Sequence, residues 1–177
     1  MPALDDPQTR AALSAHRVGA LRWLGGGAIA VVFGVLLAAA AIRIARDGGE
    51  RLPFAGLMVV ALVLGGTAAA VAGLGGLVRT HRWTAALARE PWRLGRLRVA
   101  GPAVLQVEPV GFDEYSGEPV RLQLSSTAVW RTRAVLRLAD ADVSYAPVSD
   151  REWVLTADGV GTVFGARTRP TGPGRRG

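Results

Sequence analysis

The 177-residue sequence contains no cysteine, no lysine and no asparagine, and aromatic residues make up only 6% of it. The absence of cysteine excludes disulfide bonds, thiolate metal sites and cysteine nucleophiles. Because lysine is absent, all 21 basic residues are arginine, and the formal net charge is +7. A GC-rich genome favours arginine codons over lysine and asparagine codons. We therefore interpret this bias as genomic rather than as a preference for bidentate phosphate contacts.

Charged residues are absent from two long apolar stretches in the first half of the chain. One runs for 20 residues from Trp23 to Ile42, and the other runs for 27 residues from Leu52 to Val78. About 20 apolar residues in a helix are enough to cross the hydrocarbon core of a bilayer. The sequence therefore predicts two transmembrane helices, over residues 23–42 and 54–78. A cleaved signal peptide fits the first stretch poorly, because the stretch is long and a second span follows it.

The connection between the two spans, residues 43–53, is short and polar. Asp47-Gly48-Gly49 is a turn signal, since glycine accepts a positive φ without steric cost. Pro53 suits the first turn of the second helix. A connection of this length makes the helices antiparallel neighbours, so residues 23–78 are predicted to form a transmembrane hairpin.

Small residues recur at four-residue spacing inside both spans, which predicts a face on each helix where backbones approach closely. These residues are Gly26, Ala30, Gly34 and Ala38 in the first span, and Ala61, Gly65, Ala69 and Gly73 in the second. We expect Gly34→Leu or Gly65→Leu to loosen the hairpin. The same faces leave open a homodimer or a higher homo-oligomer.

Arginines beside the spans predict the orientation of the hairpin. Nine lie on the terminal sides, namely Arg10, Arg17, Arg22, Arg79, Arg82, Arg89, Arg93, Arg96 and Arg98. Only three lie in the connection, namely Arg43, Arg46 and Arg51. The positive-inside rule therefore predicts that both termini are cytoplasmic in a two-pass protein of the bacterial plasma membrane. Residues 1–22 then form a basic cytoplasmic N-terminal segment.

The basic segment 79–96 begins directly after the second span and includes the run REPWRLGRLR. Residues 79–90 are predicted to continue the second helix as far as Pro91, which disfavours helix in the residue before it. Arginine and tryptophan so close to a span typically contact lipid headgroups. The predicted headgroup contacts are Trp83, Arg89, Trp92, Arg93, Arg96 and Arg98. Nucleic acid is not an expected partner, because no recognisable nucleic-acid-binding fold accompanies these arginines.

Beyond this segment the hydrophobic period changes to two, which indicates strands. The clearest case is VRLQLS at 120–125, where apolar and polar residues alternate. Other strand-like stretches are 97–99, 103–107, 134–138, 142–146, 152–157 and 161–167. Asp158-Gly159 is a hairpin signal between the last two. Residues 97–167 are therefore predicted to form a small antiparallel β-domain, either a sheet or a barrel. The Pro/Gly-rich basic tail, 168–177, is expected to be disordered.

No residue pattern predicts a catalytic, cofactor-binding or metal site. His16 and His81 flank the spans without acidic or thiol neighbours at ligand spacing. The acidic loop 111–119 lacks the alternating pattern of a calcium loop. GVGTVFG, at 159–165, has neither the glycine spacing nor the following helix of a phosphate-binding loop. We therefore expect a protein that is not an enzyme and needs no cofactor.

The overall plan resembles uncharacterised small membrane proteins of high-GC actinobacteria. The likeness rests on REPWR at 89–93 and on the closing stretch WVLTADGVGTVFGARTRP at 153–170. That family has no assigned activity, so the resemblance implies a bacterial plasma membrane and assigns no functional residue.

Three functional hypotheses follow from the sequence. The leading one is a non-enzymatic membrane protein whose cytoplasmic β-domain serves interaction or assembly with a protein partner. The second is a regulator at the membrane surface that binds anionic lipid through the juxtamembrane arginines and the basic tail. The third is a membrane-associated enzyme that uses carboxylates of the β-domain, such as Asp113, Glu114 or Asp158.

Overall fold

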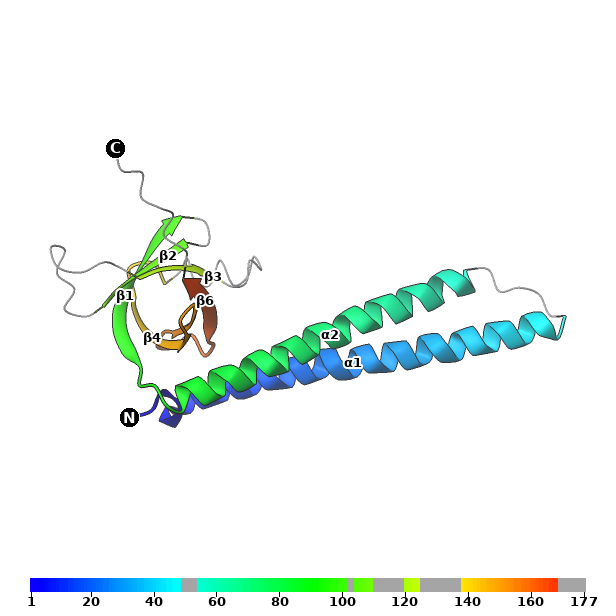
Figure 1. The fold of residues 1–177 in the computed structure, drawn as a ribbon, viewed down its shortest axis with the longest axis horizontal. Helices are drawn as coiled ribbons and strands as arrows, with labels where there is room; N and C mark the ends of the chain where they lie inside the picture. The colour runs from blue at the N-terminus through cyan, green and yellow to red at the C-terminus, as the bar shows by residue number, and fades with distance from the viewer. Residues whose placement is uncertain (49–53, 102–103, 110–119, 125–137, 169–177) are drawn as a thin grey trace. The chain divides into compact units, whose positions relative to one another are not determined.

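The computed structural model describes residues 1–48, 54–101, 104–109, 120–124 and 138–168. The chain divides into two compact units, which are considered separately (Figure 1). The hairpin unit comprises Ser14–His81, and the barrel unit comprises Met1–Leu13 together with Arg82–Gly177. Residues 134–137 of the predicted strand 134–138, the acidic loop 111–119 and residues 169–177 of the predicted tail 168–177 lie outside the described residues. Thr168, predicted to begin that disordered tail, instead ends a strand.

Two long helices form the hairpin, as the sequence predicts. Helix α1 spans Pro7–Arg46 over 40 residues, and helix α2 spans Ala55–Leu87 over 33 residues. Each contains one of the charge-free stretches. The expected helical continuation of the second span is confirmed as far as Leu87.

The helices pack closely at glycines that recur every seven residues. Gly27 and Gly34 are buried in α1, and Gly66 and Gly73 are buried in α2. A Cβ added to Gly27 would lie 2.5 Å from the backbone nitrogen of Ala70. A Cβ added to Gly66 would lie 2.7 Å from the backbone oxygen of Gly27. Only glycine therefore permits this backbone approach.

The predicted four-residue faces are correct in part. Gly34 and Gly73 lie in the interface, and the Cβ of Ala30 lies 3.0 Å from a Cβ added to Gly66. Gly26 and Gly65 do not, because nothing lies within 4 Å of a Cβ added to either. Four residues turn a helix by about 40° more than one full turn. A four-residue series therefore drifts around the helix, whereas a seven-residue series stays near one face.

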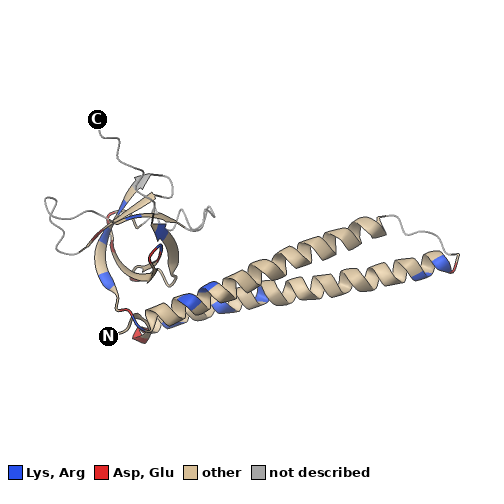
Figure 2. Ribbon diagram, in the orientation of Figure 1, with Lys and Arg blue, Asp and Glu red and all other residues tan. Residues whose placement is uncertain are grey.

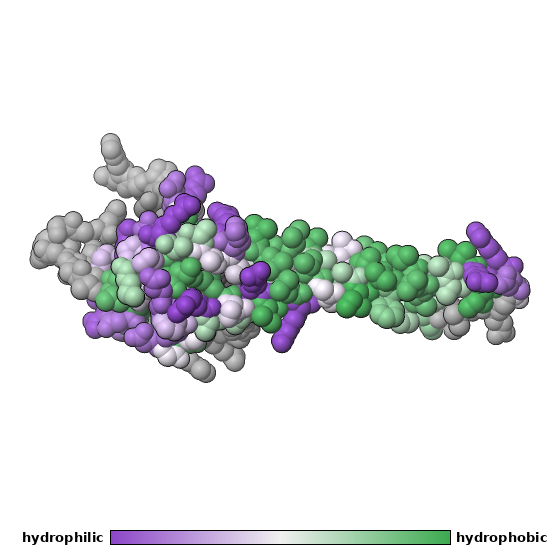
Figure 3. Space-filling model, turned by 90° about the horizontal axis from the view of Figure 1, so that it is seen from below, coloured by the Kyte–Doolittle hydropathy of each residue, from purple (hydrophilic) through white to green (hydrophobic). Residues whose placement is uncertain are grey.

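Outside this interface, the apolar side chains of the hairpin unit are exposed. The most apolar 18-residue windows of α1 and α2 are only 6% and 11% buried. Large exposed side chains include Ile29, Phe33, Leu36, Leu64 and Val71. The hydrophobic surface along the hairpin is visible in Figure 3. Both helices are long and apolar enough to cross a membrane.

The described residues contain six strands, which form a closed barrel with antiparallel pairing between neighbours. They are β1 (Arg93–Gly101), β2 (Val104–Pro109), β3 (Val120–Leu124), β4 (Asp142–Ser149), β5 (Glu152–Thr156) and β6 (Phe164–Thr168). The order around the barrel is β1-β2-β3-β6-β5-β4, and β1 also pairs with β4. The predicted antiparallel β-domain is thus a barrel, and closure leaves no open sheet edge.

Alternation of apolar and polar residues determines which side chains enter the barrel. In β3, Leu122 and Leu124 are buried, whereas Arg121 and Gln123 are exposed, as predicted. The interior also contains Leu97, Leu105, Val107, Val143, Tyr145, Leu155, Phe164 and Ala166. The remaining void, of about 10 Å³, holds at most about one water molecule. Among the described residues, the barrel interior is filled by these side chains.

A second core lies on the outer side of β4 and β5. Its buried residues come from both ends of the barrel unit's sequence, namely Ala3, Ala12, Leu13, Trp83, Leu87, Ala146, Val154 and Val163. The first 13 residues are therefore part of the barrel unit rather than of a separate basic segment. The last turns of α2, from Arg82 onward, belong to the same unit.

Polar contacts hold the N-terminal residues to the barrel. Asp6 caps α1 by accepting hydrogen bonds from the backbone N–H groups of Gln8 (3.1 Å) and Thr9 (3.0 Å). The Thr9 hydroxyl donates to Asp6 Oδ2 (2.6 Å) and accepts from Trp92 Nε1 (3.2 Å). Gln8 Nε2 donates to the carbonyl of Ala157 (3.1 Å). These bonds, led by the one from the Thr9 hydroxyl, lower the pKa of Asp6 below its ordinary value.

The lowered pKa of Asp6 predicts how the cap responds to acid. Its contribution to stability is present above the unfolded-state pKa and is lost as pH falls through the folded-state pKa. We expect Asp6→Ala to destabilise the barrel unit by about 1 kcal/mol at pH 7, the usual cost of losing a cap. Asp6→Asn keeps a side-chain oxygen that can accept a capping hydrogen bond but lacks the carboxylate charge. It should therefore remove only the part of the stability that is lost in acid. Urea unfolding of the full chain in detergent at pH 7 and below pH 4 measures both effects. Equal acid sensitivity of wild type and Asp6→Asn would contradict this assignment.

Candidate interaction face of the barrel

The outer surface of the barrel has a covered side and an open side. Outward-facing Ala146 of β4 and Val154 of β5 are fully buried by the residues of the second core. The outward positions of β1, β2, β3 and β6 instead carry polar, partly or fully exposed side chains over most of their length. Within the described residues, this open side is where the barrel can meet another molecule.

Strand register gathers four arginines on the open side. Arg98 lies opposite Gln106, and Gln106 lies opposite Arg121, so these three side chains share one row across β1, β2 and β3. Gln123 lies opposite Arg167 and extends the surface to β6. Neighbouring strands are about 4.8 Å apart, so the row from Arg98 to Arg121 spans roughly 10 Å. We call Arg96, Arg98, Gln106, Glu108, Arg121, Gln123 and Arg167 the basic face.

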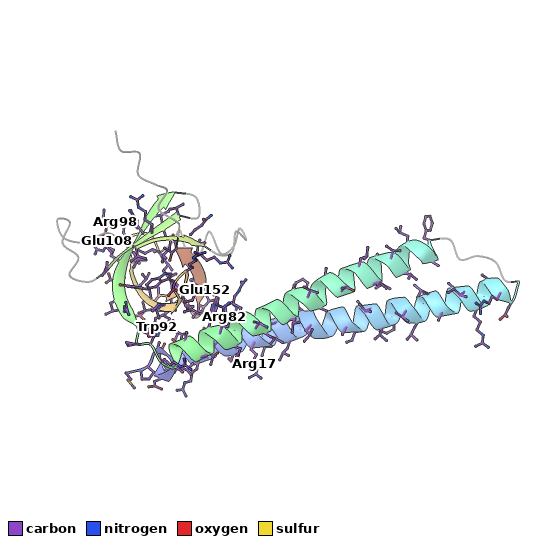
Figure 4. All side chains as sticks on the ribbon, viewed as in Figure 1. Arg17, Arg82, Trp92, Arg98, Glu108 and Glu152 are labelled. Carbon is purple, nitrogen blue, oxygen red and sulfur yellow. The ribbon has the colours of Figure 1, made fainter. Side chains whose placement is uncertain are left out.

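The basic face contains four arginines and one glutamate, so its seven residues have a net positive charge. Glu108 is the one acidic residue in this set, and its Oε1 accepts from Arg98 Nε at 2.9 Å (Figure 4). Two further acids border the face, since Asp142 lies opposite Arg96 and Glu152 lies opposite Arg167. No ion pair to Arg96, Arg121 or Arg167 is present among the described residues. The distribution of arginines over the barrel is shown in Figure 2. The face therefore suits an acidic surface or an anionic group.

The residues predicted to contact headgroups separate into two groups in the structure. Arg89, Arg93, Arg96 and Arg98 are exposed, and Arg93 pairs with Glu90 at 3.7 Å. Trp83 is only 3% exposed, and its Nε1 donates to Glu152 Oε1 at 3.1 Å. This corrects the expectation for Trp83, because a side chain packed in the second core cannot contact headgroups.

Trp92 also belongs to the barrel unit. It packs against the second core and is half-buried, with its Nε1 bonded to Thr9. Glu152, which accepts from Trp83, also pairs with Arg82 at 3.5 Å and so holds the last turns of α2 to β5. In both tryptophans the polar end of the indole is occupied by an intramolecular hydrogen bond.

Three of the residues considered for catalysis or metal binding, His16, His81 and Asp158, lie in the described part of the chain. His81 and Asp158 are exposed, and His16 is half-buried. Asp158 lies in the turn after β5, where Gly159 and Gly161 have positive φ. Among the described residues, no group of three or more His, Asp or Glu side chains is placed to hold a metal ion. Asp113 and Glu114 lie outside the described residues.

Sequence reasoning did not identify Arg121 and Arg167 as site residues. The alternation in VRLQL does place Arg121 on the polar side of β3. What the alternation does not give is the strand order, which brings β3 and β6 next to each other across a long separation in sequence. The basic face therefore depends on the order of the strands around the barrel.

No protein-family model, no curated protein and no solved structure matches this chain. The functional assignment therefore depends on the geometry of the two units alone.

Proposed function

We propose that this chain is a non-enzymatic, two-pass protein of the plasma membrane whose cytoplasmic β-barrel is a docking module for an acidic protein partner. The observation that carries the proposal is the combination of a hairpin with an exposed apolar surface and a barrel with an open basic face. Among the described residues the barrel interior is filled by side chains, which favours the outer surface as the place for binding.

Membrane insertion is supported by exposure as well as by composition. A core helix of a soluble protein is mostly buried, whereas only 6% and 11% of the apolar windows of the two helices are buried. The charge-free stretch of α1 is bounded by Arg22 and Arg43. Its 20 residues correspond to about 30 Å of helix, which equals the thickness of the hydrocarbon core.

Cysteine labelling tests the orientation, because the native chain has no cysteine. We expect Asp47→Cys to react with a membrane-impermeant maleimide in intact cells and Asp158→Cys to react only after lysis. The positive-inside distribution of arginines, nine against three, is the reason for this expectation. Labelling of Asp158→Cys in intact cells would place the barrel outside and overturn the cytoplasmic assignment.

Docking at the basic face can be tested by site-specific photocrosslinking in cells. A photoreactive residue at Gln123, which is exposed between Arg121 and Arg167, should give discrete protein adducts. Arg121→Glu should reduce these adducts about ten-fold or more, since an acidic partner would meet a like charge. The stability of the barrel should change by less than about 0.5 kcal/mol, as for most surface substitutions.

The matched control for this experiment is the photoreactive residue at Ser149, which is exposed at the end of β4 and outside the basic face. Equal adducts from both positions, or adducts at Gln123 that are unaffected by Arg121→Glu, would argue against docking at this face.

A second candidate function is binding of anionic lipid at the membrane surface. It is favoured by the exposure of Arg89 two residues beyond α2 and of Arg96 on β1. Binding of this kind should weaken steeply with salt, because exposed charges are screened over about 10 Å at 0.1 M ionic strength. Salt-insensitive association of the barrel with the membrane surface would remove this candidate.

A further inference from the structure

The hairpin unit contains an open groove beside the line of helix contact. The groove has a volume of about 310 Å³ and is lined by Arg22, Trp23, Gly26, Gly27, Ala30, Gly65, Gly66 and Ala69. Gly27 and Gly66 form its floor, since they are the buried contacts between the helices. Gly26 and Gly65 form its sides, where an added Cβ would meet nothing within 4 Å. The groove exists because these positions lack side chains.

One end of the groove is charged and the rest is apolar. Arg22 and Trp23 lie at this end, and Ala30 lies eight residues further along α1. Eight residues of helix rise about 12 Å, so the groove extends that far from the arginine. If the hairpin spans a membrane, as proposed above, Arg22 lies where the hydrocarbon begins, and the groove reaches most of the way through one leaflet of about 15 Å.

Arg22 has no acidic partner within the hairpin. The only acidic residue in the described part of that unit is Asp47, which lies about 37 Å away along α1. Trp23 is 64% exposed, as expected for an indole at the headgroup level. An anionic phosphate is the group that a guanidinium at this depth would bind, through charge-assisted hydrogen bonds.

The charge of Arg22 also argues against a second copy of the chain in the groove. A two-fold dimer places the same surface of each copy against the other. Two hairpins that met through their grooves in one membrane would bring the two Arg22 guanidinium groups to the same depth. No acid in the described hairpin would compensate this repulsion.

We propose that the groove is a binding site for one anionic phospholipid, with an acyl chain along Gly26, Ala30, Gly65 and Ala69 and the phosphate at Arg22. This inference depends on the proposed membrane insertion. It adds a specific lipid site within the bilayer, separate from the basic face of the barrel.

The test uses full-length protein purified in neutral detergent and titrated with phosphatidylglycerol or phosphatidylcholine, with bound lipids counted by native mass spectrometry. We expect one phosphatidylglycerol to be retained in preference to phosphatidylcholine. Arg22→Gln should weaken its retention about ten-fold or more, the effect of losing one charge-assisted contact. Arg22→Lys should restore most of the retention.

Filling the groove provides an independent variant. Gly26→Leu and Gly65→Leu should each weaken retention about ten-fold without separating the helices, because both positions face open space. Gly25→Leu is the matched control, since Gly25 also faces open space but does not line the groove. Arg43→Gln is the control for charge, since it removes an arginine at the opposite end of the α1 span.

Three outcomes would overturn the inference. Retention that is unaffected by Gly26→Leu and Gly65→Leu would exclude an acyl chain in the groove. Displacement of the lipid by millimolar inorganic phosphate would indicate a site for free phosphate. A crosslinked dimer that these leucine variants abolish would indicate a second copy. Carbonate extraction of wild-type protein from membranes tests membrane insertion separately from lipid binding in the groove. Release of the protein by carbonate would refute membrane insertion itself.

Discussion

Replacing Gly27 with alanine is expected to weaken the hairpin, while the same replacement at neighbouring Gly26 is expected to leave it intact or stabilise it. The new Cβ at residue 27 would lie 2.5 Å from the backbone of both Gly66 and Ala70. Backbone atoms cannot move aside as a flexible side chain can, so the helices must separate. Overpacking of this kind costs about 1–3 kcal/mol.

Gly26→Ala is the matched control because nothing lies within 4 Å of its added Cβ. Alanine is also favoured over glycine in a helix by up to about 1 kcal/mol, so the two variants should have opposite signs. The measurement is disulfide formation between Ala20→Cys and Gly76→Cys, whose Cβ atoms face each other across the helices. The background has no native cysteine. Equal crosslinking rates in both alanine variants would show that Gly27 is not a contact.

This pair of glycines also shows how far the sequence predicts the hairpin. Charge-free length and a short polar connection were enough to predict two long antiparallel helices. Small residues at four-residue spacing indicated close packing but not its register. Gly26 and Gly27 are adjacent and of the same residue type, so neither helix propensity nor local composition distinguishes them. The structure distinguishes them by burial, because Gly27, Gly34, Gly66 and Gly73 are buried at the helix contact, whereas an added Cβ at Gly26 or Gly65 meets nothing within 4 Å.

The β-domain was predictable for a different reason. Alternation in VRLQL predicts which residues of β3 face inward, and Asp158-Gly159 predicts that β5 and β6 pair as a hairpin. Both signals are local. Closure between β1 and β4, and the pairing of β3 with β6, join segments that are distant in sequence. The basic face depends on these non-local pairings, so the sequence predicted only its β1 arginines.

The position of Trp83 close to a predicted span suggested a headgroup contact, which its burial in the structure contradicts. An indole five residues after a charge-free stretch is typical of the headgroup region. The competing interpretation is that α2 continues beyond the span and packs on a folded domain. Apolar Leu87 lies four residues after Trp83 and therefore on the same helix face, which is the signal that favoured packing.

Trp83→Ala is therefore expected to destabilise the barrel unit severely. The indole is 3% exposed and packs in the second core with Leu87 and Val154. Truncation of a buried tryptophan costs about 3–5 kcal/mol, which is a large part of the total stability of a small domain. Trp83→Phe keeps most of the packing and loses the hydrogen bond to Glu152, so it should cost only about 1 kcal/mol.

Trp23→Ala is the control that separates packing from headgroup contact. Trp23 is 64% exposed, so its loss should not change the urea midpoint of the barrel unit, measured by pulse proteolysis of the full chain in detergent. Trp83→Ala should lower that midpoint sharply even in the absence of any lipid. If Trp83→Ala instead left the midpoint unchanged and altered only membrane association, Trp83 would be a headgroup contact. The last turns of α2 would then not be part of the barrel's core.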